Sequence, residues 1–313
     1  MKKTIICLAI IGYLPCLLWG QQKQMCITID DLPVVHYSIK KQAHLEYITQ
    51  KLIQTFKDYD IPAIGFVNEK KLYEKGELDS KKVALLEQWL ENGYELGNHT
   101  YAHPNYNEVG LEVFSADILK GEEVCKPLTK RYKSQYIYFR HPYLRVGSSK
   151  EEHEALQTFL KEHNYIEAPV TIDNADYLFA KAYHIAYVRK DKKLMHKIGA
   201  DYVAYMEKKL LYFEGSAQAL FQRDIKQILL LHANLLNAEY LDDLAAMYQK
   251  HGYTFIDQTQ ALEDPCYQSE ITRYGDWGIS WLDRWALSQG KKGDFFKGDP
   301  ATPKYIVDLA NWE

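Results

Sequence analysis

The sequence predicts an α/β protein built as a (β/α) barrel of about seven parallel strands. Apolar, β-branched runs of strand length alternate along the chain with segments that carry apolar residues at helical spacing. Repeated strand–helix units of this length are typical of a parallel sheet, and their number fits closure into a barrel. The apolar runs also end, one after another, in residues capable of acid–base or metal chemistry. Barrel enzymes carry their chemistry at the carboxyl ends of the strands.

The pattern places the elements in order along the chain. Strands are expected at residues 26–31, 61–67, 94–98, 136–139, 165–172, 228–231 and 253–256. Helices are expected at residues 42–59, 81–92, 111–128, 150–163 and 237–251. The first strand is followed at once by Leu32 and Pro33, and we expect it to end there because a proline cannot continue a central strand.

Length and charge limit the classes of function. The 313 residues are enough for one large domain or two small ones, and the net charge of −4 excludes a basic footprint for nucleic acid. Lys2, Lys3, an apolar run and then a polar stretch give residues 1–20 the layout of a secretory signal peptide. The run is too short for a comfortable membrane span, although an uncleaved anchor is an alternative. We therefore expect export, to the periplasm or the medium, with no integral membrane domain after cleavage.

Three cysteines remain once the signal is removed: Cys26, Cys125 and Cys266. They are too few and too scattered for a disulfide framework, and no CxxC suggests a zinc ribbon or a redox site. One bridge is possible. Cys26 lies on the first expected strand and is expected to be a buried apolar residue.

Two adjacent carboxylates, Asp30 and Asp31, end the first strand. Neighbouring residues on a strand point to opposite faces, so one of them can bind a metal while the other faces a substrate or an arginine. Two acids this close repel each other unless a cation neutralises them. A plain turn or a helix cap is the structural alternative for the pair taken alone.

Two histidines, His99 and His103, follow the third expected strand at a spacing of four. On a helix face or in a tight loop both can reach one metal ion. Together with Asp31 they would supply two nitrogens and one oxygen and leave open positions for water and substrate, as catalytic zinc sites do. The alternative is a pair of surface or capping histidines.

Five segments of the chain, in order, carry a resemblance to a known family: Thr28-Ile29-Asp30-Asp31, His99–His103, Arg140-His141-Pro142-Tyr143, Asp173-Asn174-Ala175-Asp176-Tyr177 and Leu230-Leu231-His232. They resemble the ordered motifs of the polysaccharide deacetylase family, also called the NodB-homology or carbohydrate esterase 4 family. The resemblance covers about residues 25–257. It implies a distorted (β/α) barrel, one divalent metal (usually zinc, sometimes cobalt or nickel) and removal of N-acetyl groups from N-acetylhexosamine sugars.

The resemblance also implies roles. By their positions in the motifs, Asp30 matches the catalytic base, and Asp31, His99 and His103 match the metal ligands. Arg140 matches the residue that orients the base, and Tyr143 the donor of a backbone N–H to the oxyanion. His232 matches the general acid, and either Asp173 or Asp176 the carboxylate that tunes it and Arg140. Tyr177 and Pro142 are expected at the substrate. The structural alternatives are an ion pair for Arg140, a core histidine for His232 and a turn for the two aspartates.

The sequence departs from the family pattern in several places. Leu32 stands where glycine usually follows the paired aspartates, and Tyr177 stands where tryptophan is common, so the metal-side loop and the acetyl pocket are expected to differ. The segment at about 177–222 is longer than a simple barrel connection and reads as helix over 177–189 and 195–213. It is expected to form a cap near the active face, an expected place for substrate selection. Its tyrosines could stack on sugars, although packing is the more common role.

The last segment, residues 262–313, is too small for a core of its own, and we expect it to dock on the barrel that covers residues 21–261. Its tryptophans, Trp277, Trp281 and Trp285, are expected to be buried, with a sugar-binding platform as the alternative. A short helix is expected from Ser280.

The sequence therefore predicts an exported, metal-dependent deacetylase whose partner is an acetylated glycan or oligosaccharide. Two alternatives remain open at this point. One is a related barrel hydrolase that cuts an acetyl ester or a non-sugar amide, and the other is a catalytically silent carbohydrate-binding protein.

Overall fold

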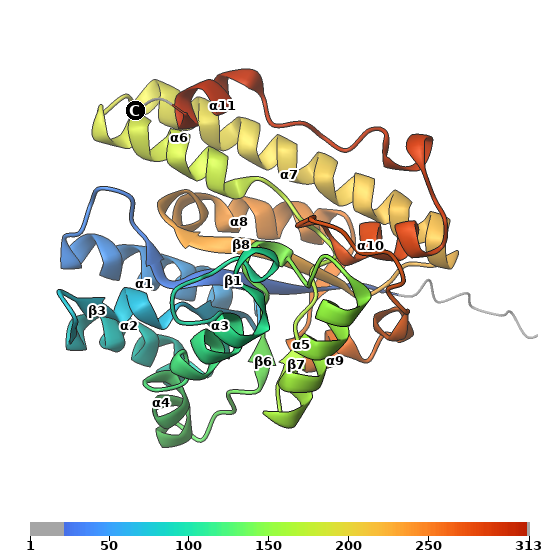
Figure 1. Cartoon of the computed structure of the whole chain (residues 1–313). Coiled ribbons are helices and arrows are strands. Elements are labelled where there is room, and N and C mark those ends of the chain that lie inside the picture. The colour runs from blue at the N-terminus through green and yellow to red at the C-terminus, as the bar shows by residue number, and fades with distance from the viewer. Residues whose placement is uncertain (1–21, 312–313) are drawn as a thin grey trace, which may run out of the picture.

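The computed structural model describes residues 22–311, so the expected signal peptide at 1–20 lies outside the described residues. A sheet of seven parallel strands forms the centre of the fold (Figure 1), in the order β7-β6-β5-β2-β1-β8, with β9 also paired with β1. The strands are β1 (Lys23–Val35), β2 (Ile64–Val67), β5 (Glu95–Asn98), β6 (Tyr138–Phe139), β7 (Ile166–Glu167), β8 (Gln227–Asn234) and β9 (Tyr253–Phe255). A separate short hairpin joins β3 (Tyr73–Glu74) to β4 (Glu77–Leu78).

The sheet curls into a distorted barrel, which confirms the predicted fold class. Beyond β7, the amides of Thr171 and Ile172 donate to the carbonyl of Ile228 at 2.9 and 3.0 Å, and Ile172 forms an isolated parallel bridge with Leu229 of β8. These bonds connect the segment after β7 to β8, at the opposite end of the sheet. The continuous strand predicted over 165–172 is wrong, however, because Pro169 interrupts it and lacks the N–H that a ladder requires.

Helices surround the barrel: α1 (Gln42–Asp58), α2 (Ser80–Glu91), α3 (Tyr106–Lys120), α4 (Cys125–Arg131), α5 (Lys150–Glu162), α6 (Asp176–Val188), α7 (Lys192–Phe221), α8 (Leu235–Lys250), α9 (Gln258–Leu262), α10 (Trp281–Ser288) and α11 (Lys304–Ala310). Four short 3-10 turns complete the set: η1 (Glu69–Leu72), η2 (Pro142–Leu144), η3 (Pro265–Gln268) and η4 (Gly293–Phe296). Of the helices within residues 22–311, none combines the length and the apolarity that crossing a bilayer requires.

The first strand does not end at Pro33 as predicted. β1 runs on to Val35, and its register with both neighbours shifts after Asp30 and Ile29. A register shift of this kind leaves residues that form no regular ladder bond, which is where a proline is tolerated within a sheet. The irregular stretch also turns the backbone of Asp31 to φ +71°, a conformation that non-glycine residues seldom adopt.

The helix predicted over 111–128 is two helices, α3 and α4. α3 starts earlier than predicted, at Tyr106, because the Asn105 side chain accepts a hydrogen bond from the Asn107 amide and caps it. It ends before Gly121, whose position leaves no room for a side chain: a Cβ there would lie 2.8 Å from the backbone of Thr100. This close approach packs the end of α3 against the loop that carries the two histidines.

The segment at about 177–222 forms α6 and α7, and α7 continues to Phe221, beyond the predicted end at 213. The two helices pack on each other and on α8, and α11 covers α6 (Figure 1). Most of their aromatic side chains belong to the core: Tyr183, Tyr202 and Tyr205 are buried, whereas Tyr187 is exposed.

The C-terminal segment packs along α7 and the rim of the barrel (Figure 1), and α10 begins after its cap Ser280. Trp281 and Trp285 are buried as predicted, but Trp277 is 38% exposed because it lies in the loop before α10, outside the helix face that packs inward. The three cysteines of the described residues are free and buried, so the bridge left possible by the sequence does not form.

Candidate active site

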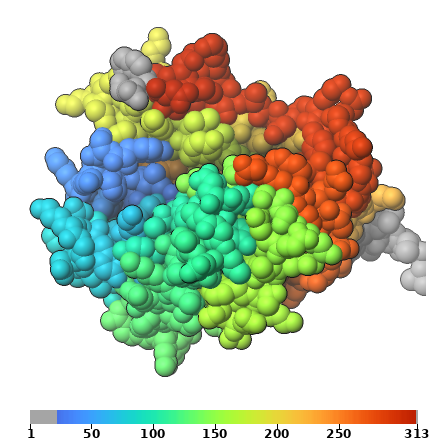
Figure 2. Space-filling model, viewed as in Figure 1, coloured from blue at the N-terminus to red at the C-terminus, as the bar shows by residue number. Residues whose placement is uncertain are grey.

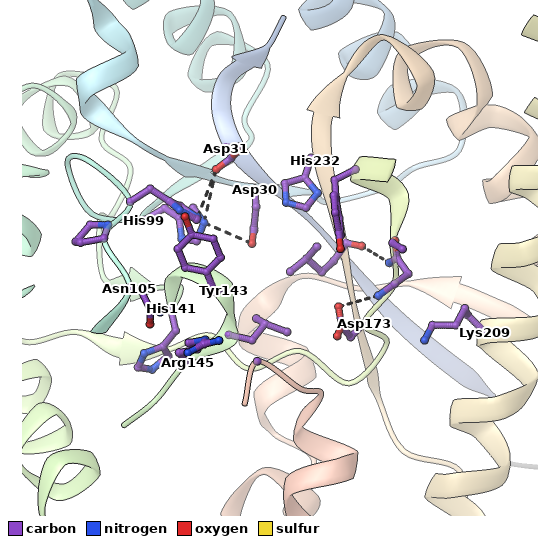
Figure 3. Close-up of a pocket in the computed structure, with 18 of the residues that line it drawn as sticks. Asp30, Asp31, His99, Asn105, His141, Tyr143, Arg145, Asp173, Lys209 and His232 are labelled. Carbon is purple, nitrogen blue, oxygen red and sulfur yellow. Dashed lines mark hydrogen bonds and ion pairs between the residues drawn. The ribbon is translucent and has the colours of Figure 1, made fainter. Parts of the chain in front are cut away.

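An open cleft of about 1200 Å³ lies at the carboxyl ends of the strands. Its lining combines the ends of β1, β5 and β8 with the 141–145 loop, the start of α3, residues of α6 and α7, and the C-terminal segment. In the space-filling view the teal and green barrel half meets the yellow-green helices and the orange-red C-terminal segment around a hollow (Figure 2). The polar residues at the strand ends point into this space (Figure 3).

The three predicted ligands converge at one side of the cleft, where Figure 3 shows Asp31 and His99 facing each other. The ligand atoms of Asp31, His99 and His103 all lie within 4.8 Å of one another. Oδ1 of Asp31 is 3.8 Å from Nε2 of His99 and 3.8 Å from Nε2 of His103. Asp31 and the histidines come from different strands, β1 and the segment after β5, whose carboxyl ends meet because the strands are parallel.

The two histidines lie in a loop, which is the second of the two arrangements that the sequence allowed. His99 Nδ1 is 2.8 Å from the carbonyl oxygen of Arg140, so this ring donates there and turns Nε2 towards Asp31. The His103 amide donates to Oγ1 of Thr100 at 2.9 Å, and the Thr100 amide donates to the Asn98 side chain at 2.7 Å. The ring bond fixes the orientation and tautomer of His99, as outer partners of metal-binding histidines do, and the two amide bonds hold the backbone of the loop.

The donor set fits a divalent cation. Oδ1 of Asp31 is buried and has no hydrogen-bond partner among the described residues, which is costly for a carboxylate oxygen unless a cation satisfies it. Burial lowers the pKa of both His99 and His103, so both rings are neutral and keep a lone pair. Burial alone would raise the pKa of Asp31, but Lys71 and the nearby histidines hold it well below the usual range. Two imidazoles and one carboxylate are typical ligands of catalytic zinc.

Asp30 lies beside Asp31 in the cleft (Figure 3), with Oδ2 3.8 Å from Nε2 of His99. Its Oδ2 is 3.4 Å from Nη1 of Arg140, while its Oδ1 is buried without a partner among the described residues. Burial raises the pKa of Asp30 to about 6, although Arg140 and His232 oppose the rise. Arg140 is itself fully buried and anchored by a 3.0 Å bond from Nη2 to Oγ1 of Thr28. Asp30 is therefore a positioned carboxylate with one free oxygen.

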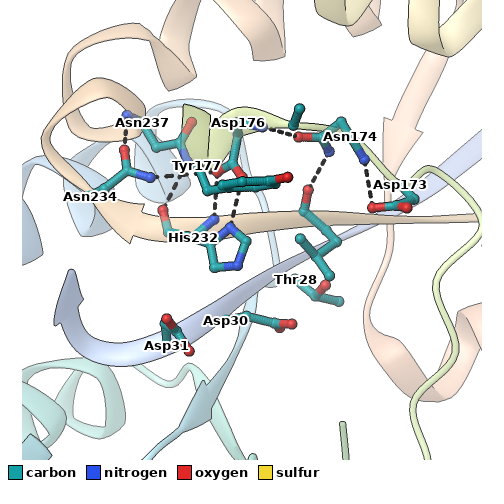
Figure 4. Close-up of polar contacts among 12 residues, drawn as sticks. Thr28, Asp30, Asp31, Asp173, Asn174, Asp176, Tyr177, His232, Asn234 and Asn237 are labelled. Atoms are coloured by element: carbon teal, nitrogen blue, oxygen red, sulfur yellow. Dashed lines mark hydrogen bonds and ion pairs between the residues drawn. The ribbon is translucent and has the colours of Figure 1, made fainter. Parts of the chain in front are cut away.

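His232 forms a charged pair with Asp176 on the opposite side of the cleft (Figure 4). Nδ1 of His232 lies 2.7 Å from Oδ1 of Asp176, and the His232 amide donates to Oδ2 at 2.9 Å. Asn237 also donates to Oδ2, at 2.7 Å. Burial alone would lower the pKa of His232, but the charge and hydrogen bond of Asp176 raise it to about 9. His232 is therefore protonated at neutral pH, and Nε2 is the ring nitrogen left for the cleft.

This pair leads to a prediction about pH. A proton donor with a pKa of about 9 acts below that pH and loses its proton as the pH rises through it, so activity should decline on the alkaline side near pH 9. In Asp176→Asn the charge that raises the pKa of His232 is removed, while the burial that lowers this pKa remains. We expect the alkaline limb of kcat to move down by about 1–3 pH units, the usual effect of a close opposite charge. Steady-state kinetics from pH 6 to 10 would measure the shift.

Asp173→Asn is the matched control for this prediction. Asp173 accepts a hydrogen bond from the Asn174 amide at 2.8 Å and lies towards Lys209, away from His232 (Figures 3 and 4). Of the two aspartates that the sequence left open, only Asp176 contacts His232. The alkaline limb of Asp173→Asn should therefore stay near pH 9. If the alkaline limb of kcat lies at the same pH in the wild type and in Asp176→Asn, the assignment of Asp176 as the partner of His232 is contradicted.

The other predicted residues differ in their exposure to the cleft. Tyr177 lines it and is 53% exposed, with its ring 6.5 Å from that of His232. Tyr143 also lines it and is 57% exposed, with its ring 4.5 Å from that of His103. Pro142 is buried within η2 and does not line the cleft, so its position does not support the expected contact with substrate. His141 also lines the cleft, and its Nε2 lies 2.7 Å from Oε1 of Glu167.

Sequence reasoning missed several residues of the site. Nζ of Lys71 lies 3.1 Å from Oδ2 and 2.9 Å from the carbonyl oxygen of Asp31. The far end of the cleft carries Tyr205 and Lys209 from α7 and Asp299 from the C-terminal segment. No local pattern marks these positions, because each reaches the cleft only through the packing of distant elements.

We predict that Lys71 orients the Asp31 carboxylate for metal binding. It holds Oδ2 and the backbone oxygen of a residue in the left-handed conformation, which leaves Oδ1 to face the two histidines. Loss of such an outer partner typically weakens metal affinity by about 10- to 100-fold. Lys71→Ala should show this loss in a competition with a fluorescent chelator.

Lys71→Gln separates orientation from charge, because it keeps a donor and removes the charge. Retained affinity in Lys71→Gln supports orientation. Tighter metal binding in both variants would contradict it, because charge repulsion would then dominate. Lys70→Ala, at the exposed neighbouring residue, is the control and should bind metal as the wild type does.

Part of the chain matches a known protein family. Residues 20–159 match the sequence model of the polysaccharide deacetylase family. A peptidoglycan-N-acetylglucosamine deacetylase of Bacillus cereus is 26% identical over 157 residues, which are 49% of this chain and 46% of the relative. The chain thus spans about half the length of that curated relative.

Solved structures share the fold. The chitin deacetylase of the fungal pathogen Colletotrichum lindemuthianum aligns with 78% of this chain and 91% of its own, at 21% identity and a TM-score of 0.51. A mutant of a carbohydrate esterase 4 pseudoenzyme with restored activity aligns with 78% of this chain and 68% of its own, at 15% identity and a TM-score of 0.50. Residues 20–159 are therefore similar to the polysaccharide deacetylase family, and most of the chain shares the barrel fold of the solved deacetylase structure.

Proposed function

We propose that the protein is a metal-dependent hydrolase that removes N-acetyl groups from an N-acetylhexosamine-containing glycan or oligosaccharide. One observation carries the proposal: a carboxylate with a free oxygen, a three-residue ligand set and a protonated histidine face the same cleft. A silent binding protein would gain nothing from burying these groups, because each is costly to desolvate. The match of residues 20–159 to the deacetylase family model supports the type of bond that is cut.

Asp31, His99 and His103 would hold the cation, most simply zinc, with cobalt or nickel as alternatives. A cation bound there would polarise the amide carbonyl and make the attacking water more acidic. Oδ1 of Asp30 takes the proton of that water, while Arg140 holds Oδ2 and keeps the carboxylate turned towards the cleft. Proton removal by a positioned base contributes about 10²- to 10⁴-fold to a rate.

The oxygen of the water forms a bond to the carbonyl carbon, and the carbon–nitrogen bond then breaks. The backbone N–H of Tyr143 is the proposed donor to the oxyanion of the tetrahedral state, an interaction that grows with the charge on that oxygen. His232 gives its proton to the departing nitrogen, so that acetate and a free amino sugar leave. Asp176 keeps His232 charged for this step.

The exposed rings of Tyr143 and Tyr177 are proposed contacts for sugar at the two sides of the reacting centre. α6 and α7 would act as a cap that selects the substrate, because Tyr205 and Lys209 of α7 line the far end of the cleft. The layout of residues 1–20 supports export. N-terminal sequencing of the mature protein should then begin after Gly20.

Acetate release tests the proposal. The purified protein, loaded with zinc or cobalt, would be incubated with chitin oligosaccharides and with peptidoglycan fragments, next to an acetylated sugar ester and a non-sugar acetamide. We expect acetate from at least one N-acetyl sugar and none after chelation. If acetate is released only from the ester or only from the acetamide, that compound class rather than an N-acetyl sugar is the substrate. Glycan affinity that survives chelation, with no acetate from any compound, would identify a silent binding protein.

A further inference from the structure

The loop that carries Tyr143 has an unusual backbone. Tyr143 and Leu144 are two successive non-glycine residues with positive φ, +57° and +53°. L residues adopt this conformation rarely, and a backbone of this kind persists only where its surroundings hold it. The loop also sets the direction of the Tyr143 N–H, which the proposed reaction aims at the oxyanion. The groups that hold this loop therefore matter for the chemistry.

The C-terminal segment supplies those groups. Nη2 of Arg284 donates to the carbonyl of Leu144 at 2.7 Å and to the carbonyl of Trp277 at 2.9 Å. Gly278 lies directly on the loop: a Cβ at this position would stand 2.0 Å from the carbonyl oxygen of Tyr143. Only glycine permits so close an approach, and Gly278 also lines the cleft.

Two further contacts fasten the same segment. Asp276 forms an ion pair with Arg145, at the end of the loop, and accepts a hydrogen bond from Asn107 at 3.2 Å. The Trp281 amide donates to the carbonyl of Val170 at 2.7 Å, which anchors the start of α10 beside the barrel. The segment 276–284 is thus fixed to three separate parts of the barrel.

Arg284 uses a buried charge in an uncommon way. It is fully buried on α10, and burial lowers its pKa to about 10. Its guanidinium donates to two backbone carbonyls and lies 5.5 Å from the centre of the Trp281 ring, while Nε and Nη1 have no hydrogen-bond partner among the described residues. A buried arginine is expensive, so packing alone does not account for it. The buried charge is explained if Arg284 serves to link two backbone turns next to the reacting centre.

We propose that residues 276–284 are part of the active site, with Arg284 and Gly278 as positioning residues that hold the Tyr143 N–H on the oxyanion. The inference rests on the proposed deacetylation. It adds a segment outside residues 20–159, the part of the chain matched by the family model. Gly278 itself is exposed and lies outside the buried apolar core.

Gly278→Ala is the sharpest test, because one methyl group on an exposed loop pushes directly on the Tyr143 carbonyl. Loss of an oxyanion donor lowers kcat by about 10²- to 10³-fold, so partial displacement should lower kcat at least about 10-fold. KM and metal affinity, measured by chelator competition, should stay within about twofold of the wild type. Gly215→Ala is the matched control, because Gly215 lies on α7 with no atom within 4 Å of an added Cβ and an ordinary φ. It should keep wild-type kcat.

Arg284→Lys provides a second measurement, because it keeps the charge but replaces the planar guanidinium by a shorter ammonium group. We expect an intermediate kcat with unchanged metal affinity. Wild-type kcat in both Gly278→Ala and Arg284→Lys, with unchanged melting temperature, would overturn the inference. So would a loss of activity that only follows a loss of folded protein or of bound metal, since the segment would then be structural. A wild-type protein that releases no acetate from any substrate contradicts the proposed function itself, and the inference falls with it.

Discussion

Asp30→Asn should lower acetate release by about 10²- to 10⁴-fold while the protein still binds its metal. The amide cannot take a proton from water, yet it matches the shape of the carboxylate and can remain beside Arg140. The three ligands come from Asp31, His99 and His103, so the substitution leaves the donor set complete. Single-turnover kinetics on a chitin oligosaccharide, together with metal content by mass spectrometry, would measure both effects.

The same substitution one residue later gives the contrast. Asp31→Asn removes the only carboxylate of the ligand set and should lose both metal and turnover. The two variants are therefore distinguished by their metal content, because both lose activity. Loss of metal in Asp30→Asn, or full turnover with metal bound, would show that the two acids have been assigned the wrong way round.

Removal of the metal should abolish turnover and lower the melting temperature without unfolding the barrel. The ligands lie at strand ends around an extensive apolar core, so the fold does not depend on the cation. A ligand at a hundredfold excess over its Kd stabilises the native state by about 2.7 kcal/mol. For a protein of this size the corresponding rise in Tm is roughly 5 °C. Differential scanning fluorimetry of chelated protein, with and without added zinc, would measure it.

His99→Ala is the decisive variant for this prediction. It removes the most buried of the three ligands, and zinc should then raise neither activity nor melting temperature. His196→Ala, on the exposed face of α7, should respond to zinc as the wild type does. A zinc-dependent rise in Tm that persists in His99→Ala would place the cation elsewhere.

Much of the barrel could be predicted because its strands are marked locally. The apolar run before Asp30 and the run before His232 each end at the residue that faces the cleft, and parallel pairing brings Asp30 opposite His232 in register. The sequence also indicated the proximity of Asp31, His99 and His103, since strand ends meet at one edge. Their roles in the reaction remain predictions.

What the sequence predicted wrongly, left open or did not reveal has physical causes that no short window contains. Pro33 lies within β1 because the register shifts around it, and the shift depends on both neighbouring strands. Asp176 rather than Asp173 contacts His232 because α6 begins at Asp176 and directs that carboxylate to β8. Lys71 and Arg284 each donate to a backbone carbonyl. Because every residue has a backbone carbonyl, no residue pattern predicts these partners.

The pairing of β1 with β8 has a consequence for biosynthesis. Thr28 and its partner Leu229 are 201 positions apart, so the strand that bears both acids is made first and completed late. At ~5–20 residues per second a ribosome needs about 10–40 s to deliver that partner. During this time one edge of a buried, apolar strand stays open, and such edges invite pairing with other chains. The nascent protein should therefore rely on chaperones until Gln227–Asn234 has emerged.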